Sequence, residues 1–456
     1  MSAEGLFDVV VLGVGSGGEY AAHRLARAGL RVAAVESRLV GGECPFWGCT
    51  PSKLMIRSAD AVAEARRAVD LAGGVSVDGP TLGPAARRIR EANHDWDDVA
   101  HADPLRDDDV VLVRGHGRLD GPGRVRVATD EGEVVLEATR GVILNTGTAP
   151  AVPPVDGLAD TPYWTNRDVV HATEAPASMA VLGGGNIGVE LTQVFARFGT
   201  DVTLLEMADR LLGPEEPEAA EVVAAALAED GVDVRTGVEV RSVHHDGRVF
   251  RLDVDGEELV VERLLVAAGR SQNIADVGLE TVGLDPDADA VEVDERCRAA
   301  ERLWAVGDIT GKGAFTHVSL YQAGVAVSDL LGEDGPPAEY HAVSRVTFTD
   351  PEVGAVGLTE AQARGQGIDV VTGTAEIGRA PRGWIHGASG VVKIVADRER
   401  GVLVGATTVS PAGGEVLGML TTAVHARVPV ASLKHMHFAY PTFHRTIEVA
   451  LHKTGL

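Results

Sequence analysis

FDVVVLGVGSGGEYAAHRLARAGLRVAAVES, residues 7–37, reads as a strand, a tight turn, a helix and a second strand. Its first apolar run leads into Gly13-x-Gly15-x-x-Gly18, and its second ends at Glu36. In such a turn the first glycine permits the bend, the second lets backbone approach a pyrophosphate, and the third lets helix pack on strand. The helix N-terminus attracts phosphate, and the acid can bond a ribose hydroxyl. The stretch predicts a Rossmann-like dinucleotide-binding unit.

The same signature recurs in SMAVLGGGNIGVELTQVFARFGTDVTLLEM, residues 178–207, with Gly183, Gly185 and Gly188 after a short apolar strand. Glu206 stands 18 residues beyond Gly188, the same spacing as that from Gly18 to Glu36. An acid there favours NAD over NADP, because it would repel a 2′-phosphate, although Arg210 lies nearby in the sequence. Two fingerprints predict two dinucleotides, one nicotinamide and one flavin, and therefore an electron relay.

The segments between and after the fingerprints fit this architecture. Residues 141–150 and 263–273 each read as a buried strand running into a glycine turn, as expected of strands that close the two nucleotide-binding sheets. LWAVGDITG (303–311) places Asp308 at a strand end, where it could bind polyol or ribityl hydroxyls or simply cap a turn. The Pro/Gly-rich stretch 331–343 reads as a linker, and the chain beyond it as a separate α+β domain.

Composition limits the classes of function. A chain of 456 residues is expected to form two to four domains, and 45% hydrophobic with 24% charged residues is ordinary for a globular protein. The formal charge of −26 argues against nucleic acid and anionic membranes as partners. We expect no membrane span and no signal peptide. Three cysteines do not make a disulfide framework, so we expect a cytoplasmic protein.

Two of those cysteines, Cys44 and Cys49, lie in GGECPFWGCTPSK, residues 41–53. Residues five apart in a regular helix are separated by roughly 8.6 Å, whereas a disulfide needs Cα atoms within about 7 Å. A bridge here therefore requires a distorted turn, which we attribute to Pro45 and Gly48. From Thr50 onward the chain reads as a helix whose positive end would stabilise a thiolate on Cys49.

Other interpretations of the pair are weaker. A structural staple would stabilise by only about 2 kcal/mol, in a compartment that keeps thiols reduced. A zinc site needs further ligands at characteristic spacing, and none lies nearby in the sequence, so we predict no metal site. Two buried thiols without a joint role would be reasonable individually, but they are not expected so close to each other and to a nucleotide-binding segment. A dithiol that exchanges electrons with a flavin accounts best for the pair, and Cys297 reads as a buried structural thiol.

The whole chain resembles the pyridine nucleotide–disulfide oxidoreductases, which include dihydrolipoamide dehydrogenase, glutathione reductase and mercuric reductase. The resemblance lies in the FAD fingerprint at 13–18, the redox pair at 41–53 with Gly42, and Thr146-Gly147. It continues through the NAD fingerprint at 183–188, Gly269-Arg270, AVGD at 305–308 and FTDPEVGAVGLTEAQA at 348–363. It implies an FAD domain with the redox disulfide at 1–150, an NAD domain at 151–270, a remainder of the FAD domain at 271–336 and a dimerisation domain at 337–456.

The resemblance also implies roles for single residues. NADH would reduce FAD, and the flavin would pass two electrons to the Cys44–Cys49 disulfide. Cys49 would be the thiol beside the flavin and Cys44 the interchange thiol. Lys53 would lie near the flavin N5 with Glu190 as its ion-pair partner. The segment FTHVSL, which contains His317, would face the flavin ring through its backbone.

The sequence departs from the family at the C-terminal acid–base segment. Where these disulfide reductases carry a His, and a Glu five residues later, this chain has Tyr440 and Arg445 in HFAYPTFHR. Tyrosine, with an ordinary pKa near 10, is a poorer base at neutral pH than histidine. Mercuric reductases are similar in having Tyr here, but they end in a cysteine pair that this sequence lacks. His437 and His444 flank the position and could substitute, or could be structural.

The redox loop departs as well. Phe46 and Trp47 replace a small polar and an aliphatic residue, and Glu43 replaces the customary Thr. The two aromatic residues would either reshape the substrate face or pack against the flavin domain.

Three hypotheses follow. The first is an NADH-dependent, FAD-containing homodimeric reductase of a small-molecule or protein disulfide, with dihydrolipoamide dehydrogenase proper as a variant. The second is a flavin-based quinone, dye or metal-ion reductase whose thiols are not essential. The third is a non-catalytic redox-sensing or assembly subunit, against which two complete nucleotide fingerprints argue.

Overall fold

The computed structural model describes residues 5–74 and 76–456, which fall into two compact units. The first contains residues 5–51, 87–150 and 270–339, and the second contains residues 52–86, 151–269 and 340–456. The helices α3 (Cys49–Ala72) and α4 (Gly83–Ala92) each begin in one unit and end in the other. The four domain segments expected from the sequence stay a prediction. The N-terminal stretch for which we expected no signal peptide includes residues 1–4, which lie outside the described residues.

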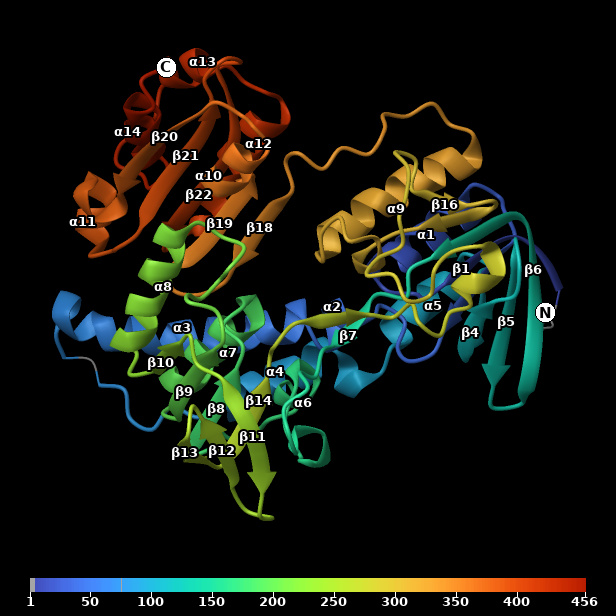
Figure 1. The fold of residues 1–456 in the computed structure, drawn as a ribbon, viewed down its shortest axis with the longest axis horizontal. Coiled ribbons are helices and arrows are strands. Elements are labelled where there is room, and N and C mark those ends of the chain that lie inside the picture. Colours follow the sequence, from blue (N-terminus) through green and yellow to red (C-terminus); the bar gives the residue numbers. More distant parts are fainter. Residues whose placement is uncertain (1–4, 75) are drawn as a thin grey trace. The chain divides into compact units, whose positions relative to one another are not determined.

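The first unit is built on one large sheet. Its main path runs β16-β17-β6-β1-β2-β3, and β5 pairs with β6 and β4. The strands are β1 (Gly5–Leu12), β2 (Val32–Glu36), β3 (Val111–Arg114), β4 (His116–Leu119), β5 (Arg124–Thr129), β6 (Gly132–Leu144), β16 (Arg298–Ala300) and β17 (Leu303–Ala305). The pairs β1–β2, β1–β6, β2–β3 and β6–β17 are parallel. Residues 141–144 form the end of β6, a buried strand of this sheet as predicted, but β6 lies between β1 and β17 and therefore does not close the sheet (Figure 1).

Strand β1 is buried on both faces, which explains its continuous apolar sequence. Val9 and Val11 pack on one face with α1 (Ser16–Arg27), α5 (Val99–Asp107) and α9 (Thr316–Leu331). Val10 and Leu12 pack on the other face with apolar residues of β5. Because side chains alternate along a strand, an all-apolar run is what a parallel sheet covered on both sides requires. The sheet thereby holds the first glycine turn at a fixed edge.

A two-stranded ladder lies where the chain leaves and re-enters the first unit. Strands β7 (Thr148–Pro150) and β15 (Arg270–Gln272) pair antiparallel, with Thr148 opposite Gln272. The remaining helix of this unit, α2 (Glu43–Phe46), carries the redox loop.

The second unit contains the second nucleotide-binding sheet. Strands β8 (Ser178–Leu182), β9 (Asp201–Glu206), β10 (Asp233–Thr236) and β14 (Arg263–Val266) form an all-parallel sheet in the order β10-β9-β8-β14. Strand β14 pairs with β8, which confirms the second predicted closing strand. Beside it lie the antiparallel strands β11 (Val240–His245), β12 (Phe250–Val254) and β13 (Glu257–Val261), and the helices α6 (Asn166–Val169), α7 (Asn186–Arg197) and α8 (Pro217–Glu229).

The C-terminal part of this unit is an α+β domain, as predicted. Five antiparallel strands, drawn in orange to red in Figure 1, run in the order β18-β19-β22-β21-β20. They are β18 (Ser344–Thr347), β19 (Glu352–Gly357), β20 (Val370–Glu376), β21 (Val391–Asp397) and β22 (Val402–Ser410). The helices are α10 (Glu360–Gly365), α11 (Pro381–His386), α12 (Gly413–His425), α13 (Val430–Lys434) and α14 (Arg445–Lys453). The preceding stretch 333–343 forms no helix or strand, as expected of a linker.

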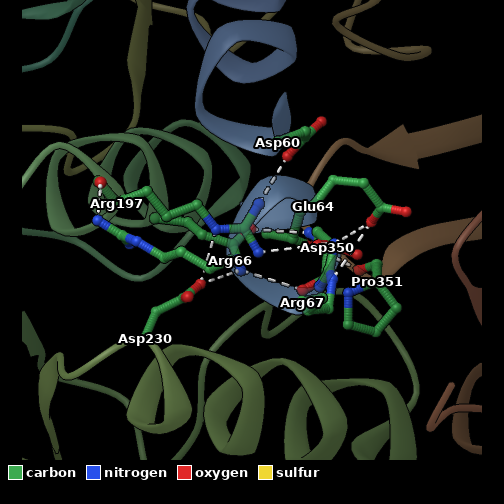
Figure 2. Close-up of polar contacts among 10 residues, drawn as sticks. Asp60, Glu64, Arg66, Arg67, Arg197, Asp230, Asp350 and Pro351 are labelled. Atoms are coloured by element: carbon green, nitrogen blue, oxygen red, sulfur yellow. Dashed lines mark hydrogen bonds and ion pairs between the residues drawn. The ribbon is translucent and has the colours of Figure 1, made fainter. Parts of the chain in front are cut away.

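A buried arginine fixes helix α7 within the second unit (Figure 2). The side chain of Arg197 is 3% exposed and contacts three carboxylates: Asp60 at 2.7 Å, Asp230 at 2.9 Å and Asp350 at 2.8 Å. Asp350 also pairs with Arg67 of α3 at 2.8 Å. Because three carboxylates surround one buried cation, their charges cannot all be compensated equally. The network joins α7, the helix of the second fingerprint, to α3 and to the loop before β19.

Candidate active site

The first glycine turn has the geometry that a dinucleotide requires. Gly13 has a φ of +90°, and a Cβ on Gly18 would collide with the Gly13 carbonyl oxygen. Helix α1 begins directly after Gly15, which places no side-chain cap over its N-terminal N–H groups. Glu36 at the end of β2 accepts hydrogen bonds from the Val14 N–H and the Arg38 N–H, both at 2.8 Å. Burial raises the pKa of Glu36, and these backbone donors oppose the rise.

The second glycine turn repeats this geometry element by element. Gly183 has a φ of +111°, and a Cβ on Gly188 would collide with the Gly183 carbonyl oxygen. Gly185, at the N-cap of α7, has φ −77° and ψ −176°, against −73° and −176° for Gly15. Glu206 accepts from the Gly184 N–H at 2.6 Å and the Ala208 N–H at 2.7 Å. Both predicted fingerprints therefore have the backbone geometry that binding of a pyrophosphate on a helix N-terminus requires, and the binding itself stays a prediction.

The two turns differ in what covers them. The backbone of Gly41 bridges to Gly15, and a Cβ on Gly42 would lie 2.8 Å from the Gly15 Cα. An ideal Cβ on Gly185 would have no atom within 4 Å among the described residues. Residues 41–42 thus lie against Gly15 of the first turn. In the second turn the chain contacts Gly184 instead: a Cβ there would lie 2.5 Å from the Leu211 side chain, and the Leu212 N–H donates to the Gly184 carbonyl at 2.9 Å. Arg210 donates hydrogen bonds to the carbonyls of Leu212, Gly213 and Glu215, so its guanidinium is held in its own loop.

Asn145 supports the first turn and was not identified from the sequence. Its Oδ1 accepts from the Gly18 N–H at 2.8 Å, and its Nδ2 donates to the Val306 carbonyl at 2.9 Å and to Ser319 Oγ at 3.2 Å. The side chain is buried, so it locks α1, β17 and α9 together at the glycine turn. The sequence feature that could have identified Asn145 is its position directly after strand β6 and before Thr146-Gly147.

The remaining predicted cofactor residues lie in loops of the two units and at the start of α9. Thr146 donates to the Asn273 carbonyl at 2.7 Å, and Gly147 has a φ of +64°. His317 is the second residue of α9 and stacks on Phe315 with 5.3 Å between ring centroids. Gly269, the last residue of segment 151–269 of the second unit, has a φ of +113°. Whether each of these residues contacts a cofactor stays a prediction.

The cysteine pair lies at a break between two helices. Helix α2 ends at Phe46, Trp47 leaves helical geometry with a φ of −135°, and α3 begins at Cys49. The predicted distortion is therefore present, but it falls at Trp47–Gly48. Pro45 lies within the short α2, where a proline is tolerated in the first turn. Both cysteines carry free thiols in the structure.

The two thiols are unequal. Cys49 is exposed and Cys44 is half-buried. The hydrogen bond between the two thiols and the burial of Cys44 both raise the pKa of Cys44 far above that of a free thiol, although the Thr316 hydroxyl opposes the rise. The Cys49 Sγ lies 3.4 Å from the Thr316 Oγ1. The third cysteine, Cys297, is buried among apolar residues, as predicted.

Of the two aromatic residues in the redox loop, Phe46 belongs to the core. Its side chain is 1% exposed, and its ring centroid lies 5.9 Å from that of Trp47 and 5.8 Å from that of His101. Trp96 Nε1 donates to the Phe46 carbonyl at 3.1 Å. Packing, the second of the two interpretations, therefore holds for Phe46, whereas Trp47 is half-buried and retains a partly exposed face.

The Glu43 carboxylate is part of a polar chain within the first unit. It pairs with Arg270 of β15 at 3.4 Å. Arg270 donates to the Thr148 Oγ1 at 2.6 Å, and Thr148 donates in turn to Asp308 at 2.8 Å. The chain joins the redox loop, the ladder β7–β15 and the acid expected at the flavin polyol. Sequence reasoning identified Asp308 and the departure at Glu43 but not the link between them.

In the second unit, Lys53 and Glu190 form the ion pair that the resemblance implied. Lys53 Nζ lies 2.8 Å from the Glu190 carboxylate, whose second oxygen accepts from the Phe348 N–H at 2.8 Å. The ammonium also lies over the Phe348 ring, 4.7 Å from its centroid. Glu190 is 5% exposed, so these partners replace most of the water that would otherwise solvate its carboxylate. The ion pair is present, and its catalytic role stays a prediction.

The C-terminal segment presents Tyr440 to solvent. Tyr440 is 68% exposed, and the Arg445 guanidinium lies 5.6 Å from its ring centroid. Arg445 also pairs with Glu448 at 3.1 Å, so a carboxylate is present one helical turn beyond the position expected from the family. His437 is exposed, and His444 lies at the N-cap of α14 against the Phe438 ring.

Comparison with known proteins identifies the family. Residues 7–326 match the family described as pyridine nucleotide-disulphide oxidoreductase, and residues 343–451 match its dimerisation domain. The chain belongs to this family. It is an FAD-dependent oxidoreductase that uses a pyridine nucleotide, and the predicted fold class and cofactors are confirmed. The dimerisation domain supports a homodimer.

Relatives span the whole chain but carry different names. The chain is 34% identical to a dihydrolipoyl dehydrogenase of Halobacterium salinarum, over 98% of this chain and 96% of the relative. It is 32% identical to a mercuric reductase of Shigella flexneri, over 98% of this chain and 81% of the relative. A solved structure, the Cu(II) complex of the HOCl-induced flavoprotein disulfide reductase RclA from Escherichia coli, matches with a TM-score of 0.87 at 27% identity, over 98% and 99% of the two chains.

Two predicted absences can be examined in the described part of the chain. Among residues 5–74 and 76–456, no group of three or more His, Cys, Asp or Glu side chains is placed to hold a metal ion. None of the described helices is both long and apolar enough to cross a bilayer.

Proposed function

We propose that this enzyme reduces a disulfide through Cys44 and Cys49, with Cys44 as the interchange thiol and Cys49 as the thiol beside the flavin. The observation that carries the proposal is the unequal pair itself. The thiols are hydrogen-bonded to each other at a helix break, and Cys44 holds its proton more tightly. Cys49 is the first residue of α3, where the positive end of a helix favours a thiolate, so we assign the thiolate of the reduced pair to Cys49.

The exchange chemistry balances over two steps. Bound FAD supplies a two-electron relay between the nicotinamide and the Cys44–Cys49 disulfide. After reduction, the Cys44 sulfur gives up its proton and attacks one sulfur of the substrate disulfide, which forms a mixed disulfide and releases one thiolate. The Cys49 thiolate then attacks the Cys44 sulfur, re-forms the internal disulfide and releases the second thiolate. The proton lost by Cys44 passes to the first released thiolate and the second thiolate takes a proton from water, so the substrate gains two electrons and two protons.

Supporting roles follow from the geometry of each unit. We assign Glu190 to hold the Lys53 ammonium, because the pair is short and the carboxylate is buried. We assign Tyr440, which is exposed on the dimerisation domain, to the place of the family's acid–base residue. A small-molecule or protein disulfide is the proposed substrate, and NADH is the proposed donor because Glu206 disfavours a 2′-phosphate. The cytoplasm is the proposed compartment.

A second candidate function is reduction of a metal ion or quinone. It is favoured by the Tyr440–Arg445 pair, which replaces the histidine and carboxylate expected for proton transfer to a thiol. Two of the relatives point the same way, one named mercuric reductase and the other solved as a Cu(II) complex. Arg445 is already paired with Glu448, so the pair offers no obvious general base.

The test is anaerobic reduction of the purified flavoprotein with NADH, followed by a panel of disulfides, quinones, Hg(II) and Cu(II). We expect rapid turnover of at least one disulfide, and loss of that turnover in both Cys44→Ser and Cys49→Ser. Cys297→Ser is the matched control, because this thiol is buried in the core. Disulfide turnover that survives Cys49→Ser would refute the thiol route. Turnover of quinones or metal ions alone would favour the second function.

A further inference from the structure

We propose that Thr316 is a positioning residue whose hydroxyl holds the negative charge of the reduced cysteine pair on Cys49. The inference rests on the proposed thiol route and adds a residue that neither fingerprint nor redox motif contains. Thr316 is the first residue of α9, and its Oγ1 lies 3.4 Å from the Cys49 Sγ. Both residues belong to the first unit.

The direction of this hydrogen bond depends on the state of the sulfur. Between a thiol and a hydroxyl either atom can donate. Once Cys49 loses its proton, only the hydroxyl can donate, and the bond becomes charge-assisted and stronger. A disulfide sulfur is only a weak acceptor. The contact therefore favours the thiolate of Cys49 over its thiol and over the oxidised pair.

The helix that carries Thr316 acts in the same direction. Helix α9 runs for 16 residues from Thr316 to Leu331, and its N-terminus carries the positive end of the helix dipole. The N-cap position belongs to Phe315, which makes no side-chain cap. Thr316 is therefore not at the position where a threonine ordinarily caps a helix, and its hydroxyl is directed to the sulfur.

The hydroxyl is also within reach of the partner sulfur. Hydrogen bonding to Thr316 lowers the pKa of Cys44, although the bond from Cys49 and burial outweigh it. One donor thus lies beside two sulfurs of which only one is exposed. The contact of 3.4 Å places the donor against the exposed Cys49 sulfur, where it can bind a thiolate. Without the hydroxyl, we expect charge and proton to be distributed less unequally between the two thiols.

The test isolates the Cys49 thiol in the FAD-containing enzyme. In a Cys44→Ser background, Cys49 is the one exposed cysteine among the described residues, since Cys297 is buried. Three forms are compared: Thr316, Thr316→Val, which keeps the shape but removes the donor, and Thr316→Ser, which restores it. The pH midpoint is measured from the rate of iodoacetamide modification, followed by mass spectrometry, and from the long-wavelength thiolate–flavin absorption.

We expect Thr316→Val to raise the pH midpoint of Cys49 by about one unit, a tenfold change in thiolate stability, and Thr316→Ser to restore it. Equal midpoints in the Thr and Val forms would overturn the inference. A shift in Val that Ser does not reverse would also overturn it, because packing rather than donation would then be responsible. Failure of the thiol route shows separately, as disulfide turnover that survives Cys49→Ser in the otherwise unchanged enzyme.

Discussion

Asp60→Asn should stabilise the protein at neutral pH, although it removes one partner of the buried Arg197. Burial, together with the charges of Asp350 and Glu352, raises the pKa of Asp60 from its ordinary 3.8 to about 6, and Arg197 opposes this only in part. The ionised carboxylate is therefore a net cost in the folded state. Asparagine can still accept from the Arg197 guanidinium through its amide oxygen and carries no charge.

The magnitude follows from the pKa shift. A rise of about two units corresponds to about 3 kcal/mol at 1.36 kcal/mol per unit. The Asp60 side chain is 35% exposed, so water screens much of this, and we expect about 1 kcal/mol. A group whose pKa is higher in the folded state stabilises below its unfolded pKa and loses that contribution as pH rises through the folded pKa. The advantage of Asp60→Asn should therefore grow between pH 4 and pH 6 and stay constant above.

The assay compares thermal midpoints of wild type and Asp60→Asn from about pH 4.5 to 8, at one protein concentration and saturating FAD. Asp350→Asn is the matched control on the same arginine. Burial opposes ionisation of Asp350 too, but Arg197 and Arg67 outweigh it and lower its pKa. Asp350→Asn should lower the thermal midpoint throughout this pH range, because the pKa of Asp350 lies below the range and the lost carboxylate would be ionised at every pH tested. A lower midpoint for Asp60→Asn at pH 8 would refute the reasoning.

Three further outcomes are expected. Gly188→Ala should raise the KM for NADH at least about tenfold with an unchanged flavin spectrum, because its Cβ would collide with the Gly183 carbonyl; an unchanged KM would contradict this. Glu206→Gln should narrow the ratio of kcat/KM for NADH over NADPH by about tenfold, since it removes the charge that repels a 2′-phosphate; an unaltered ratio would show that another residue discriminates. Lys393→Met should lower the thermal midpoint by the equivalent of about 3 kcal/mol. Lys393 is 6% exposed, and its ammonium neutralises the carboxylates of Glu216, Glu218 and Glu360. Equal thermal midpoints would mean that these carboxylates are well solvated without it.

The sequence was sufficient for the parts of the fold that local patterns determine. The two glycine turns, their strands and the helix after Cys49 follow from spacing and apolar runs, and each lies where it was predicted. The break between Cys44 and Cys49 could be inferred because a regular helix is too long for the bridge. Its location at Trp47–Gly48 could not, since that depends on how Phe46 packs in the core.

Contacts between distant segments were beyond reach of the sequence. Thr316 lies 267 positions from Cys49, and Asn145 lies 127 positions from Gly18. Neither residue type is unusual where it occurs, and only the folded sheet brings the partners together. The Lys53–Glu190 pair was anticipated, but through resemblance to a family and not through spacing. Chemistry that depends on long-range pairing is therefore where a structure adds most.

The different covers over the two glycine turns have a consequence for how long each nucleotide stays. Residues 41–42, where the redox loop begins, lie against Gly15, so the redox loop borders the first turn. In the described structure no other segment lies at the Cβ position of Gly185, although Leu211 and Leu212 contact the neighbouring Gly184. We expect one nucleotide to remain through many catalytic cycles as a prosthetic group, and the other to exchange with the surrounding pool in every cycle.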